Sequence, residues 1–434
     1  MAAAKPRLVI IGSGWAGFYV AERIDLSKYA VTMISPRRMS AYTPLLASAA
    51  VGIFNFSLAE ETVRSRSRQQ LKFIKGNVLD IDFDGKTCKC APAFEEDPEL
   101  AAQEFAVEYD YLVIAPGCMP NTFGTPGVEE YGIFIKNVSD AILVRKRLFD
   151  LLEMASLPHV SVERKKALLH VAIVGGGPTG IELTAELDDL CRHELRDLYP
   201  DVVDYLSISI YDVASHILGA YDKSLYEYAT AQLQKRKVDV APNTKIEKVD
   251  KDALHIKDKG SIPYGMLIWA TGNKQVPLVE KLDVKLPPRG LKRILTDERC
   301  RVFKSGNASS SHEIYDGVFA IGDAADIEGV SLPTTAEVAC QKGKYLVDNF
   351  NLKEDTAKFT APFKYNQKQL MSYIGEHDGV IAGRGPNDPG VTGRRAWLAW
   401  RGGSLAWNRS WRSRVAIVIT WMMNAVFGRD VSKI

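Results

Sequence analysis

The same three-part pattern occurs twice in this chain of 434 residues, and it limits the fold more than any other feature of the sequence. The stretch Arg7–Ile11, which is apolar after Arg7, leads into the turn Gly12-Ser-Gly-Trp-Ala-Gly17, and a helix-like stretch follows. The second copy leads from Leu169–Val174 into Gly175-Gly-Gly-Pro-Thr-Gly180, and we expect its helix to reach about Leu198. A strand, a glycine turn and a helix in this order open a βαβ unit. The sequence therefore predicts an α/β fold with two Rossmann-like units.

A second internal likeness supports this duplicated plan. Tyr109–Gly117 and Ile262–Gly272 each hold an apolar strand that ends in a small residue, one further residue and a glycine. The chain is also too long for one ordinary domain. Its 46% of hydrophobic and 25% of charged residues are typical of globular proteins. A formal net charge of +2 gives no reason to expect a nucleic-acid partner.

Glycine turns in this setting let the backbone approach a pyrophosphate, and the helix N-terminus supplies free N–H groups. Two such turns in one chain predict two dinucleotide sites. The second copy ends its next strand at Asp212, where a carboxylate can bind ribose hydroxyls and repel a 2′-phosphate. This favours NADH there, unless Asp212 is only a solvated residue at a strand end.

The first copy has no acid at the corresponding position and reads Ile34-Ser-Pro-Arg-Arg38 instead. Arg37 and Arg38 taken alone could indicate NADP. However, Gly317-Val-Phe-Ala-Ile-Gly-Asp323 is a strand that ends in Gly-Asp, and its carboxylate can bind the ribityl hydroxyls of a flavin. We therefore assign the first site to FAD, with Ser35 and Arg37 around its adenosine and Arg38 as a solvated side chain.

Over nearly its whole length the sequence resembles the type II, or alternative, NADH:quinone oxidoreductases. The resemblance rests on the two glycine turns and on these further stretches: Ile34–Arg37, Thr43–Leu46, Ala50–Gly52, Tyr109–Gly117, Asn121–Gly124, Glu182, Ile262–Asn273, Phe319–Asp323 and Ala336–Gln341. It implies non-covalent FAD, hydride transfer from NADH, two-electron reduction of a quinone without proton pumping, and a peripheral membrane mount through the C-terminal end.

The resemblance also implies site residues. Those expected around FAD are Gly12, Ser13, Gly14, Ala16, Gly17, Ser35, Pro36, Arg37, Thr43, Ala115, Gly117, Gly322 and Asp323. Those expected around NADH are Gly175, Gly177, Thr179, Gly180, Asp212, Ala270, Thr271, Gly272 and Asn273. Glu182 is expected on the nicotinamide side of the flavin, and Ala336–Gln341 beside the quinone. The implied domains are 1–165 with 295–365 for FAD, 166–294 for NADH, and 366–434 for membrane association.

One position departs from the family pattern. The quinone segment of the family reads Ala-Gln-x-Ala-x-Gln, whereas this chain has Ala336-Glu-Val-Ala-Cys-Gln341. Gln341 is retained but Glu337 replaces the first glutamine, and a carboxylate can donate a hydrogen bond to a quinone only when it is protonated. The alternative is that Glu337 points away and pairs with Lys342 or Lys344. We expect Glu182, Glu337 and Gln341 to be the catalytic residues.

The C-terminal end has its own composition. From Val380 onward nine Lys or Arg stand against two Asp, and five of the seven Trp lie there. Trp411, Val415, Val418 and Met422 recur at helical spacing, and a basic, Trp-rich amphipathic helix is typical of a surface that meets anionic lipid. The alternative is a packed pair of helices. The longest apolar stretch, Val415–Met423, is too short to span a bilayer.

Other functional classes remain as alternatives: a soluble FAD-dependent reductase with another acceptor, and an NADH sensor similar to apoptosis-inducing factor. A disulfide reductase would need a cysteine pair after Gly17, and we expect the six cysteines to be reduced. Asp80–Gly85 looks like a calcium loop, but the twelfth position is Ala91, so we expect a β-hairpin and no metal site.

The compartment is predicted from the resemblance, which implies the mitochondrial inner membrane, with a homodimer possible. We expect no signal peptide and no Arg/Ser-rich transit segment near the first residues. The alternative compartment is the peroxisome, because Ser432-Lys-Ile434 differs by one residue from the peroxisomal targeting signal Ser-Lys-Leu.

Overall fold

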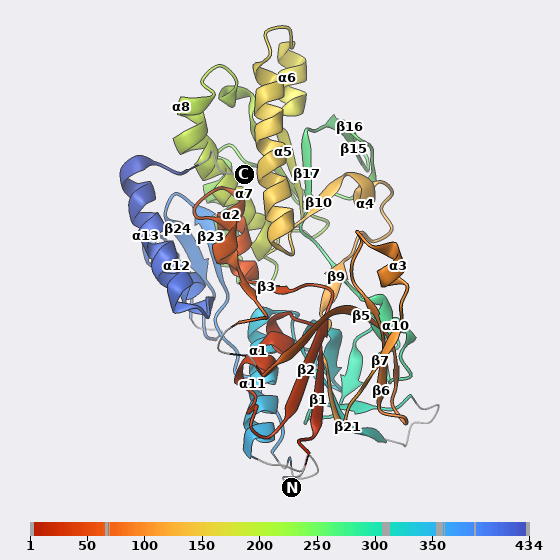
Figure 1. The fold of residues 1–434 in the computed structure, drawn as a ribbon. Coiled ribbons are helices and arrows are strands. Elements are labelled where there is room, and N and C mark those ends of the chain that lie inside the picture. Colours follow the sequence, from red (N-terminus) through yellow and green to blue (C-terminus); the bar gives the residue numbers. More distant parts are fainter. Residues whose placement is uncertain are drawn as a thin grey trace. The chain divides into compact units, whose positions relative to one another are not determined.

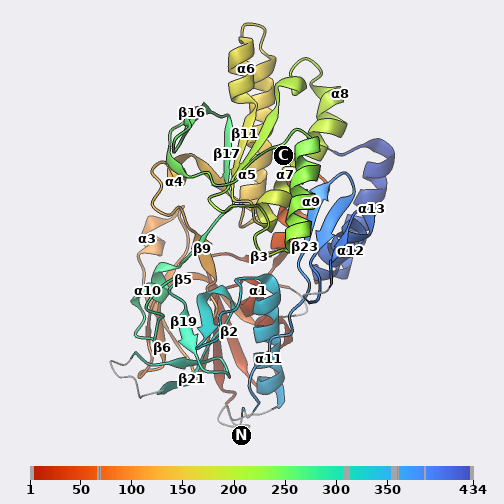
Figure 2. The same cartoon turned by 180° about the vertical axis from the view of Figure 1, so that it is seen from behind.

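The computed structural model describes residues 4–65, 68, 70–305, 313–352, 359, 361–385 and 388–430. Ser432–Ile434, on which the peroxisomal alternative rests, lies outside these residues. Contacts divide the chain into two compact units, which we describe separately (Figures 1 and 2). Unit 1 comprises residues 1–40, 62–119 and 273–368, and unit 2 comprises 41–61, 120–272 and 369–434.

Unit 1 is built on a mixed ten-stranded sheet of order β22-β19-β20-β21-β8-β1-β2-β5-β6-β7. Its strands are β1 (Arg7–Ile11), β2 (Ala30–Ser35), β5 (Lys72–Asp82), β6 (Thr87–Pro92), β7 (Phe105–Glu108), β8 (Tyr111–Ile114), β19 (Ile294–Thr296), β20 (Arg301–Phe303), β21 (Ile314–Ala320) and β22 (Ala325–Ile327). The central strands β5, β2, β1, β8 and β21 run parallel. The α/β class is therefore confirmed for this unit.

The apolar run of β1 reflects burial on both faces of this sheet. Leu8 and Ile10 belong to the core on one face, while Val9 and Ile11 belong to the core on the other. The first face packs against α1 (Trp15–Arg23) and α11 (Ala336–Leu352). Because successive strand side chains alternate between faces, a continuous apolar strand is what a covered parallel sheet requires.

The segment that resembles a calcium loop is a hairpin, as predicted. β5 and β6 pair antiparallel, and the turn between them is held by Asp82 Oδ1, which accepts a hydrogen bond from Gly85 N at 2.8 Å. Cys88 and Cys90 of β6 are buried free thiols, and all six cysteines are free.

Unit 2 contains a five-stranded, fully parallel sheet of order β10-β17-β11-β12-β13. Its strands are β10 (Gly132–Phe134), β11 (His170–Val174), β12 (Ser207–Tyr211), β13 (Asp239–Ala241) and β17 (Met266–Trp269). The helix after the second glycine turn has three parts: α7 (Pro178–Leu190), a π-helical turn η4 (Cys191–Leu195) and α8 (Arg196–Leu198). The predicted helix to Leu198 is thus present, but its last turns change hydrogen-bond register.

Unit 2 also holds further helices and an antiparallel sheet. These are the helices η1 (Thr43–Leu45), α2 (Leu46–Ala50), η2 (Phe56–Ala59), α4 (Val128–Tyr131), α5 (Val138–Ser156), α6 (Val162–Leu168) and α9 (Lys223–Lys235), and the antiparallel strands β14 (Ile246–Val249), β15 (Ala253–Ile256) and β16 (Gly260–Pro263). A three-stranded sheet, β23 (Met371–Gly375), β24 (Asp378–Ile381) and β25 (Val391–Thr392), packs against α7 and α12 (Arg394–Trp407).

The C-terminal end of unit 2 is a pair of helices, α12 and α13 (Trp411–Phe427). Figure 1 shows them side by side. α12 buries Ala396, Trp400 and Ser404, whereas α13 buries Ile417. Within the described ranges, no helix is both long and apolar enough to cross a membrane.

Candidate active site

The first glycine turn has the geometry that a bound pyrophosphate requires. Gly12 adopts φ +98°, and a Cβ there would lie 2.2 Å from the carbonyl oxygen of Ala115. A Cβ on Gly17 would lie 2.1 Å from the oxygen of Gly12, so the helix is seated tightly on the turn. Gly14 is the N-cap of α1, has open space beside it and provides no side-chain cap. The first N–H groups of α1 are therefore left for an anion.

The predicted adenosine residues come together at the edge of this turn. The buried hydroxyls of Ser13 and Ser35 lie 2.9 Å apart, and Ser13 Oγ also contacts the carbonyl oxygen of Arg37 at 2.9 Å. The backbone N–H of Arg37 donates to Ser35 Oγ at 3.3 Å. Pro36, Arg37 and Arg38 are exposed. The hydroxyls thus shape the loop, and the Arg37 side chain is accessible at its rim.

Asp323 lies in a segment that packs against the start of α1. It follows β21 in the short helix η6 (Gly322–Ala324), where Gly322 adopts φ +73° and a Cβ on it would lie 3.1 Å from the Ala16 side chain. Cys118 Sγ donates to Asp323 Oδ2 at 3.3 Å. A phosphate-binding turn and a carboxylate that meet in one unit fit FAD.

The second glycine turn repeats this construction in unit 2. Gly175 adopts φ +117°, a Cβ there would lie 2.8 Å from the oxygen of Ala270, and a Cβ on Gly180 would lie 2.0 Å from the oxygen of Gly175. Gly177 is the N-cap of α7, without a side-chain cap and with open space beside it. The carbonyl oxygen of Ala115 lies against Gly12 in unit 1, and the carbonyl oxygen of Ala270 lies against Gly175 in unit 2. These are the two strand ends that resemble each other in sequence.

Asp212 follows β12 directly beside this turn. Its Oδ2 accepts from Gly176 N at 2.6 Å and its Oδ1 accepts from Ala214 N at 2.8 Å. The carboxylate therefore holds the glycine turn in place while it stands at the expected ribose position. Thr271 and Gly272 lie in the segment after β17, and Gly272 adopts φ +75°.

Two predicted residues, one from each set, lie in the other unit. Thr43 starts η1 in unit 2, whereas the first glycine turn lies in unit 1. Asn273 belongs to unit 1, where its Nδ2 donates to Thr334 Oγ1 at 2.9 Å. Gly117 adopts φ +77° with open space around it.

Glu182 is a buried carboxyl in the second turn of α7. Trp400 Nε1 donates to its Oε1 at 2.8 Å, and Ser372 Oγ lies 3.4 Å from the same atom. Burial raises the pKa of Glu182 to about 8, although the Trp400 hydrogen bond opposes this shift. A carboxyl with such a pKa can take up and release a proton near neutral pH.

Further along α7, more acids face the same interior. Ser48 Oγ donates to Glu186 Oε1 at 2.7 Å, and burial raises the pKa of Glu186. Asp189 forms an ion pair with Arg236 and accepts a hydrogen bond from the Tyr373 hydroxyl. One signal for this cluster was present in the sequence, because acids recur inside an otherwise apolar helix at Glu182, Glu186, Asp188 and Asp189.

The expected acceptor segment forms the first turns of α11 in unit 1. Gln341 Nε2 donates to Glu337 Oε1 and to the carbonyl oxygen of Asn366 at 2.8 Å, and Gln341 Oε1 accepts from Asn366 N at 2.9 Å. The alternative prediction, that Glu337 pairs with Lys342 or Lys344, is wrong. Lys344 pairs with Asp348, and Lys342 is buried beside Asp326. Glu337 and Gln341 therefore form one hydrogen-bonded pair.

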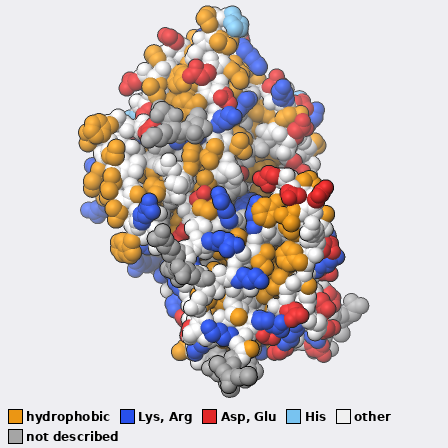
Figure 3. Space-filling model, in the orientation of Figure 1, with side chains coloured by type: hydrophobic (Ala, Val, Ile, Leu, Met, Phe, Trp, Pro, Cys, Tyr) orange, Lys and Arg blue, Asp and Glu red, His pale blue; other side chains and the backbone are white. Residues whose placement is uncertain are grey.

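The outer face of α13 is apolar and exposed. The side chains of Trp411, Val415, Ile419, Met422 and Val426 are 75%, 54%, 52%, 64% and 73% exposed. They recur at three- and four-residue steps, and hydrophobic side chains gather over α13 in Figure 3. Trp411, Val415 and Ile419 also line, together with Val418, an apolar groove of about 390 Å³ between α12 and α13.

With this geometry established, comparison with known proteins identifies the family. A family model described as pyridine nucleotide-disulphide oxidoreductase matches residues 6–343. The internal alternative NAD(P)H-ubiquinone oxidoreductase A1, mitochondrial, of Arabidopsis thaliana is 35% identical, over 99% of this chain and 86% of that protein. A Solanum tuberosum protein of the same name is 34% identical, over 99% of this chain and 88% of that protein.

The chain belongs to the alternative NADH dehydrogenases, within this wider family.

A solved structure agrees with that membership. The structure of NDH2 from Plasmodium falciparum in complex with NADH matches with a TM-score of 0.88 and 27% identity, over 99% of this chain and 100% of that one. The family resemblance predicted from sequence is thereby confirmed. In this alternative NADH dehydrogenase, Asp212 lies beside the second glycine turn, and Asp323 follows a glycine that packs against Ala16 of α1.

Proposed function

We propose that this protein oxidises NADH through a bound FAD and reduces a quinone with two electrons. The observation that carries the proposal is the repeated glycine turn, each closed by an alanine carbonyl and each beside a carboxylate, in a chain whose relatives are named NAD(P)H-ubiquinone oxidoreductases. When bound, FAD supplies the two-electron centre between the two substrates. The protein itself binds, orients and handles protons.

Each nucleotide has its own residues in this proposal. The N–H groups at the start of α1 hold the FAD pyrophosphate, Asp323 holds the ribityl hydroxyls, and Ser35 and Arg37 flank the adenosine. The N–H groups at the start of α7 hold the NADH pyrophosphate, and Asp212 holds the ribose. The nucleotide domains are proposed with the limits given above, 1–165 with 295–365 for FAD and 166–294 for NADH.

The acceptor side rests on two residues. Glu337 and Gln341 lie in the turns of α11 that the family uses for quinone, and their hydrogen-bonded pair offers an amide and a carboxyl to a quinone carbonyl. On the nicotinamide side we propose Glu182, which holds a proton near neutral pH because its pKa is raised to about 8. We assign to it the uptake and release of a proton during NADH oxidation.

The same proposal includes attachment to a membrane surface through residues 366–434. The exposed stripe on α13 supports it, together with Arg412 and Arg414 in the first turn of that helix. Arg409, which precedes α13, does not contribute, because its guanidinium is buried over the Tyr42 ring. The names of the relatives support a mitochondrial location, and we propose the inner membrane with a homodimeric assembly. The molar mass of the purified protein, measured by light scattering, tests the homodimer. A separate test addresses the membrane: removal of the chain from Arg394 onward should abolish binding to anionic liposomes.

The experiment that tests the function is steady-state NADH oxidation with a panel of acceptors. The flavin is first released by denaturation and identified as FAD, which also tests non-covalent binding. A short-chain quinone should be reduced faster than a soluble dye or a small redox protein. Fast turnover with the dye alone would support the soluble reductase instead, and slow turnover with every acceptor would support the sensor.

A further inference from the structure

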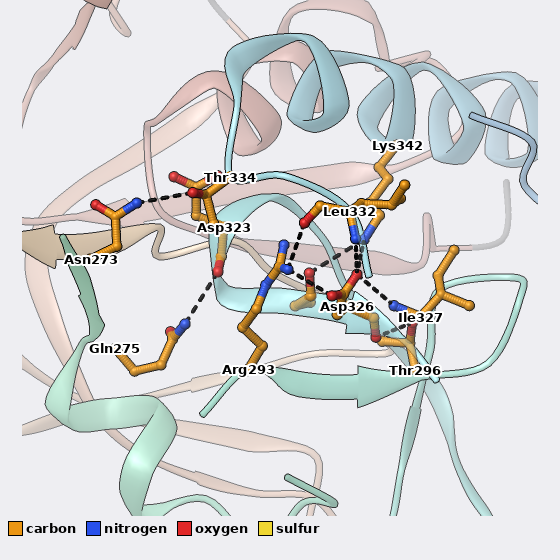
Figure 4. Close-up of polar contacts among 11 residues, drawn as sticks. Asn273, Gln275, Arg293, Thr296, Asp323, Asp326, Ile327, Leu332, Thr334 and Lys342 are labelled. Carbon is orange, nitrogen blue, oxygen red and sulfur yellow. Dashed lines mark hydrogen bonds and ion pairs between the residues drawn. The ribbon is translucent and has the colours of Figure 1, made fainter. Parts of the chain in front are cut away.

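Unit 1 contains a buried ion cluster that the proposed chemistry does not use. Arg293 precedes β19, Asp326 lies on β22 and Lys342 lies on α11, and their exposed fractions are 7%, 8% and 0%. Arg293 Nη1 lies 2.6 Å from Asp326 Oδ2, and Lys342 Nζ lies 4.0 Å from Asp326 Oδ1. Figure 4 shows the two cationic side chains converging on this one carboxylate.

Stability alone does not account for the cluster. Two cations share one carboxylate, and among the described residues Nε and Nη2 of Arg293 have no hydrogen-bond partner. Burial lowers the pKa of Lys342, while Cys300, Asp326 and Asp323 oppose that effect and Arg293 adds to it. Buried ion pairs seldom stabilise a fold more than apolar side chains of similar volume would, and their better-attested role is to fix one arrangement of the chain.

The arrangement that this cluster fixes is the loop between β22 and α11. Arg293 Nη1 donates to the carbonyl oxygen of Leu332 at 2.8 Å, and the N–H of Leu332 donates to Asp326 Oδ1 at 3.4 Å. Both backbone groups of Leu332 are therefore held by the cluster. Lys342 Nζ donates to the carbonyl oxygen of Ala325 at 3.3 Å, which attaches α11 directly to β22.

The held loop leads straight into the acceptor segment. Thr334 Oγ1 accepts from Asn273, and Thr335 Oγ1 accepts from Val338 N at 3.3 Å at the start of α11. Lys342 directly follows Gln341 in the helix. Two anchors, at Leu332 before the acceptor segment and at Lys342 after it, therefore determine where Glu337 and Gln341 lie.

We propose that Arg293, Asp326 and Lys342 are positioning residues for the acceptor segment, and that they set the KM for quinone without contacting it. The inference rests on the proposed function, because it assigns the acceptor to the first turns of α11. It goes beyond that function in naming residues that act through the loop at Leu332 and through the helix itself.

Arg293→Met is the first test, because it removes the hold on the Leu332 carbonyl and keeps an apolar side chain of similar length. The KM for a short-chain quinone should rise about tenfold, the effect expected when a hydrogen bond from a charged group is lost. The rate of flavin reduction by NADH, measured alone by stopped flow, should not change. Arg289→Met is the matched control, since Arg289 is an exposed cation of the same segment.

Lys342→Met separates positioning from stability. It removes the surplus buried cation and leaves the Arg293–Asp326 pair, so the Tm should stay the same or rise, while the KM for quinone rises about threefold. Lys344→Met, on the exposed side of the same helix, should alter neither quantity. If Arg293→Met does not retain FAD, the KM for quinone of Lys342→Met decides whether the cluster positions the acceptor segment.

Hydrogen exchange of the loop gives a readout that is independent of turnover. In the FAD-loaded protein, the amide of Leu332 should exchange faster in Arg293→Met than in the control. An unchanged KM in both cluster variants, or equal losses in both half-reactions together with a lower Tm, would overturn the proposal. If the unmodified protein does not reduce quinone, the proposed function fails, and the exchange of Leu332 still shows whether the cluster holds the loop.

Discussion

Trp400 Nε1 donates a hydrogen bond to Glu182 Oε1 at 2.8 Å, and this bond joins helix α12 to helix α7 inside unit 2. The Trp400 ring also stacks on Tyr373, with centroids 4.9 Å apart. The hydrogen bond favours the charged carboxylate, whereas burial favours the neutral acid, and burial has the larger effect. A residue near the C-terminal end thus adjusts the proton affinity of a carboxyl on the helix that follows the second glycine turn.

The stability of the protein should therefore depend on the protonation of Glu182. Its pKa rises from 4.5 to about 8 on folding, so the folded state binds the proton more tightly than the unfolded chain does. The resulting stabilisation is complete below pH 4.5 and is lost as the pH rises to about 8. In Glu182→Gln, the decrease in Tm over this range should be smaller, because an amide does not titrate.

Two comparisons make that measurement specific. Glu186 and Glu194 also have raised pKa values, so Glu182→Gln should reduce the pH dependence without abolishing it. Trp400→Phe removes the bond that favours the carboxylate and should extend the loss of stability to higher pH. Parallel Tm curves for the unmodified protein and Glu182→Gln would contradict this account.

Much of the fold could be predicted because its signals are local. Each glycine turn lies within six consecutive residues, and the apolar runs of β1 and β11 match strands that are buried on both faces. The partners of Glu182 could not be predicted in this way. Trp400 and Ser372 are 218 and 190 residues away in sequence, and nothing near Glu182 indicates which aromatic or hydroxyl side chain it meets.

The loop anchor in unit 1 escaped prediction for a related reason. Lys342 is adjacent to Gln341, and on an amphipathic helix a lysine is normally expected to be solvent-exposed. Its burial depends on Asp326, which lies on β22 and is brought next to Lys342 only by the fold. The π-helical turn after α7 likewise has no marker such as proline or glycine at Cys191–Leu195.

Nucleotide preference should change with Asp212. Asp212→Asn removes the negative charge that repels a 2′-phosphate, so the ratio of kcat/KM for NADH to that for NADPH should fall, by about tenfold. The amide oxygen can still accept from Gly176 or Ala214, so the turn should survive. Asp239→Asn, at an exposed position on the neighbouring strand β13, serves as the control. Equal use of both nucleotides by the unmodified protein would contradict the assignment.

Membrane binding should depend on the exposed stripe of α13. Ile419→Asp combined with Met422→Asp places two charges on side chains that are 52% and 64% exposed, so the fold should tolerate them. Co-sedimentation with anionic liposomes should fall strongly, because these positions would have to enter the apolar layer. Leu198→Asp, at an exposed apolar position 52% accessible on α8, should sediment as the unmodified protein does. Equal sedimentation of the double variant would exclude α13 as the contact.

The Glu337–Gln341 pair makes the last prediction. An ionised carboxylate cannot donate a hydrogen bond to a quinone carbonyl, whereas a protonated carboxyl or an amide can. Glu337→Gln supplies an amide that can donate a hydrogen bond at this position, so quinone reduction should be retained or become faster, while flavin reduction by NADH should not change. The new amide oxygen can still accept from Gln341, so the pair itself should survive the substitution.

Stopped-flow measurement of the two half-reactions checks this prediction directly. Glu337→Ala is the informative contrast, because it leaves Gln341 Nε2 with only the Asn366 carbonyl to bind and gives the quinone no donor at this position. Its quinone half-reaction should be slower than that of the unmodified protein, while its flavin reduction by NADH should be the same. If Glu337→Ala reduced quinone as fast as the unmodified protein, Glu337 would have no part in binding the acceptor, and Gln341 alone would have to orient the quinone.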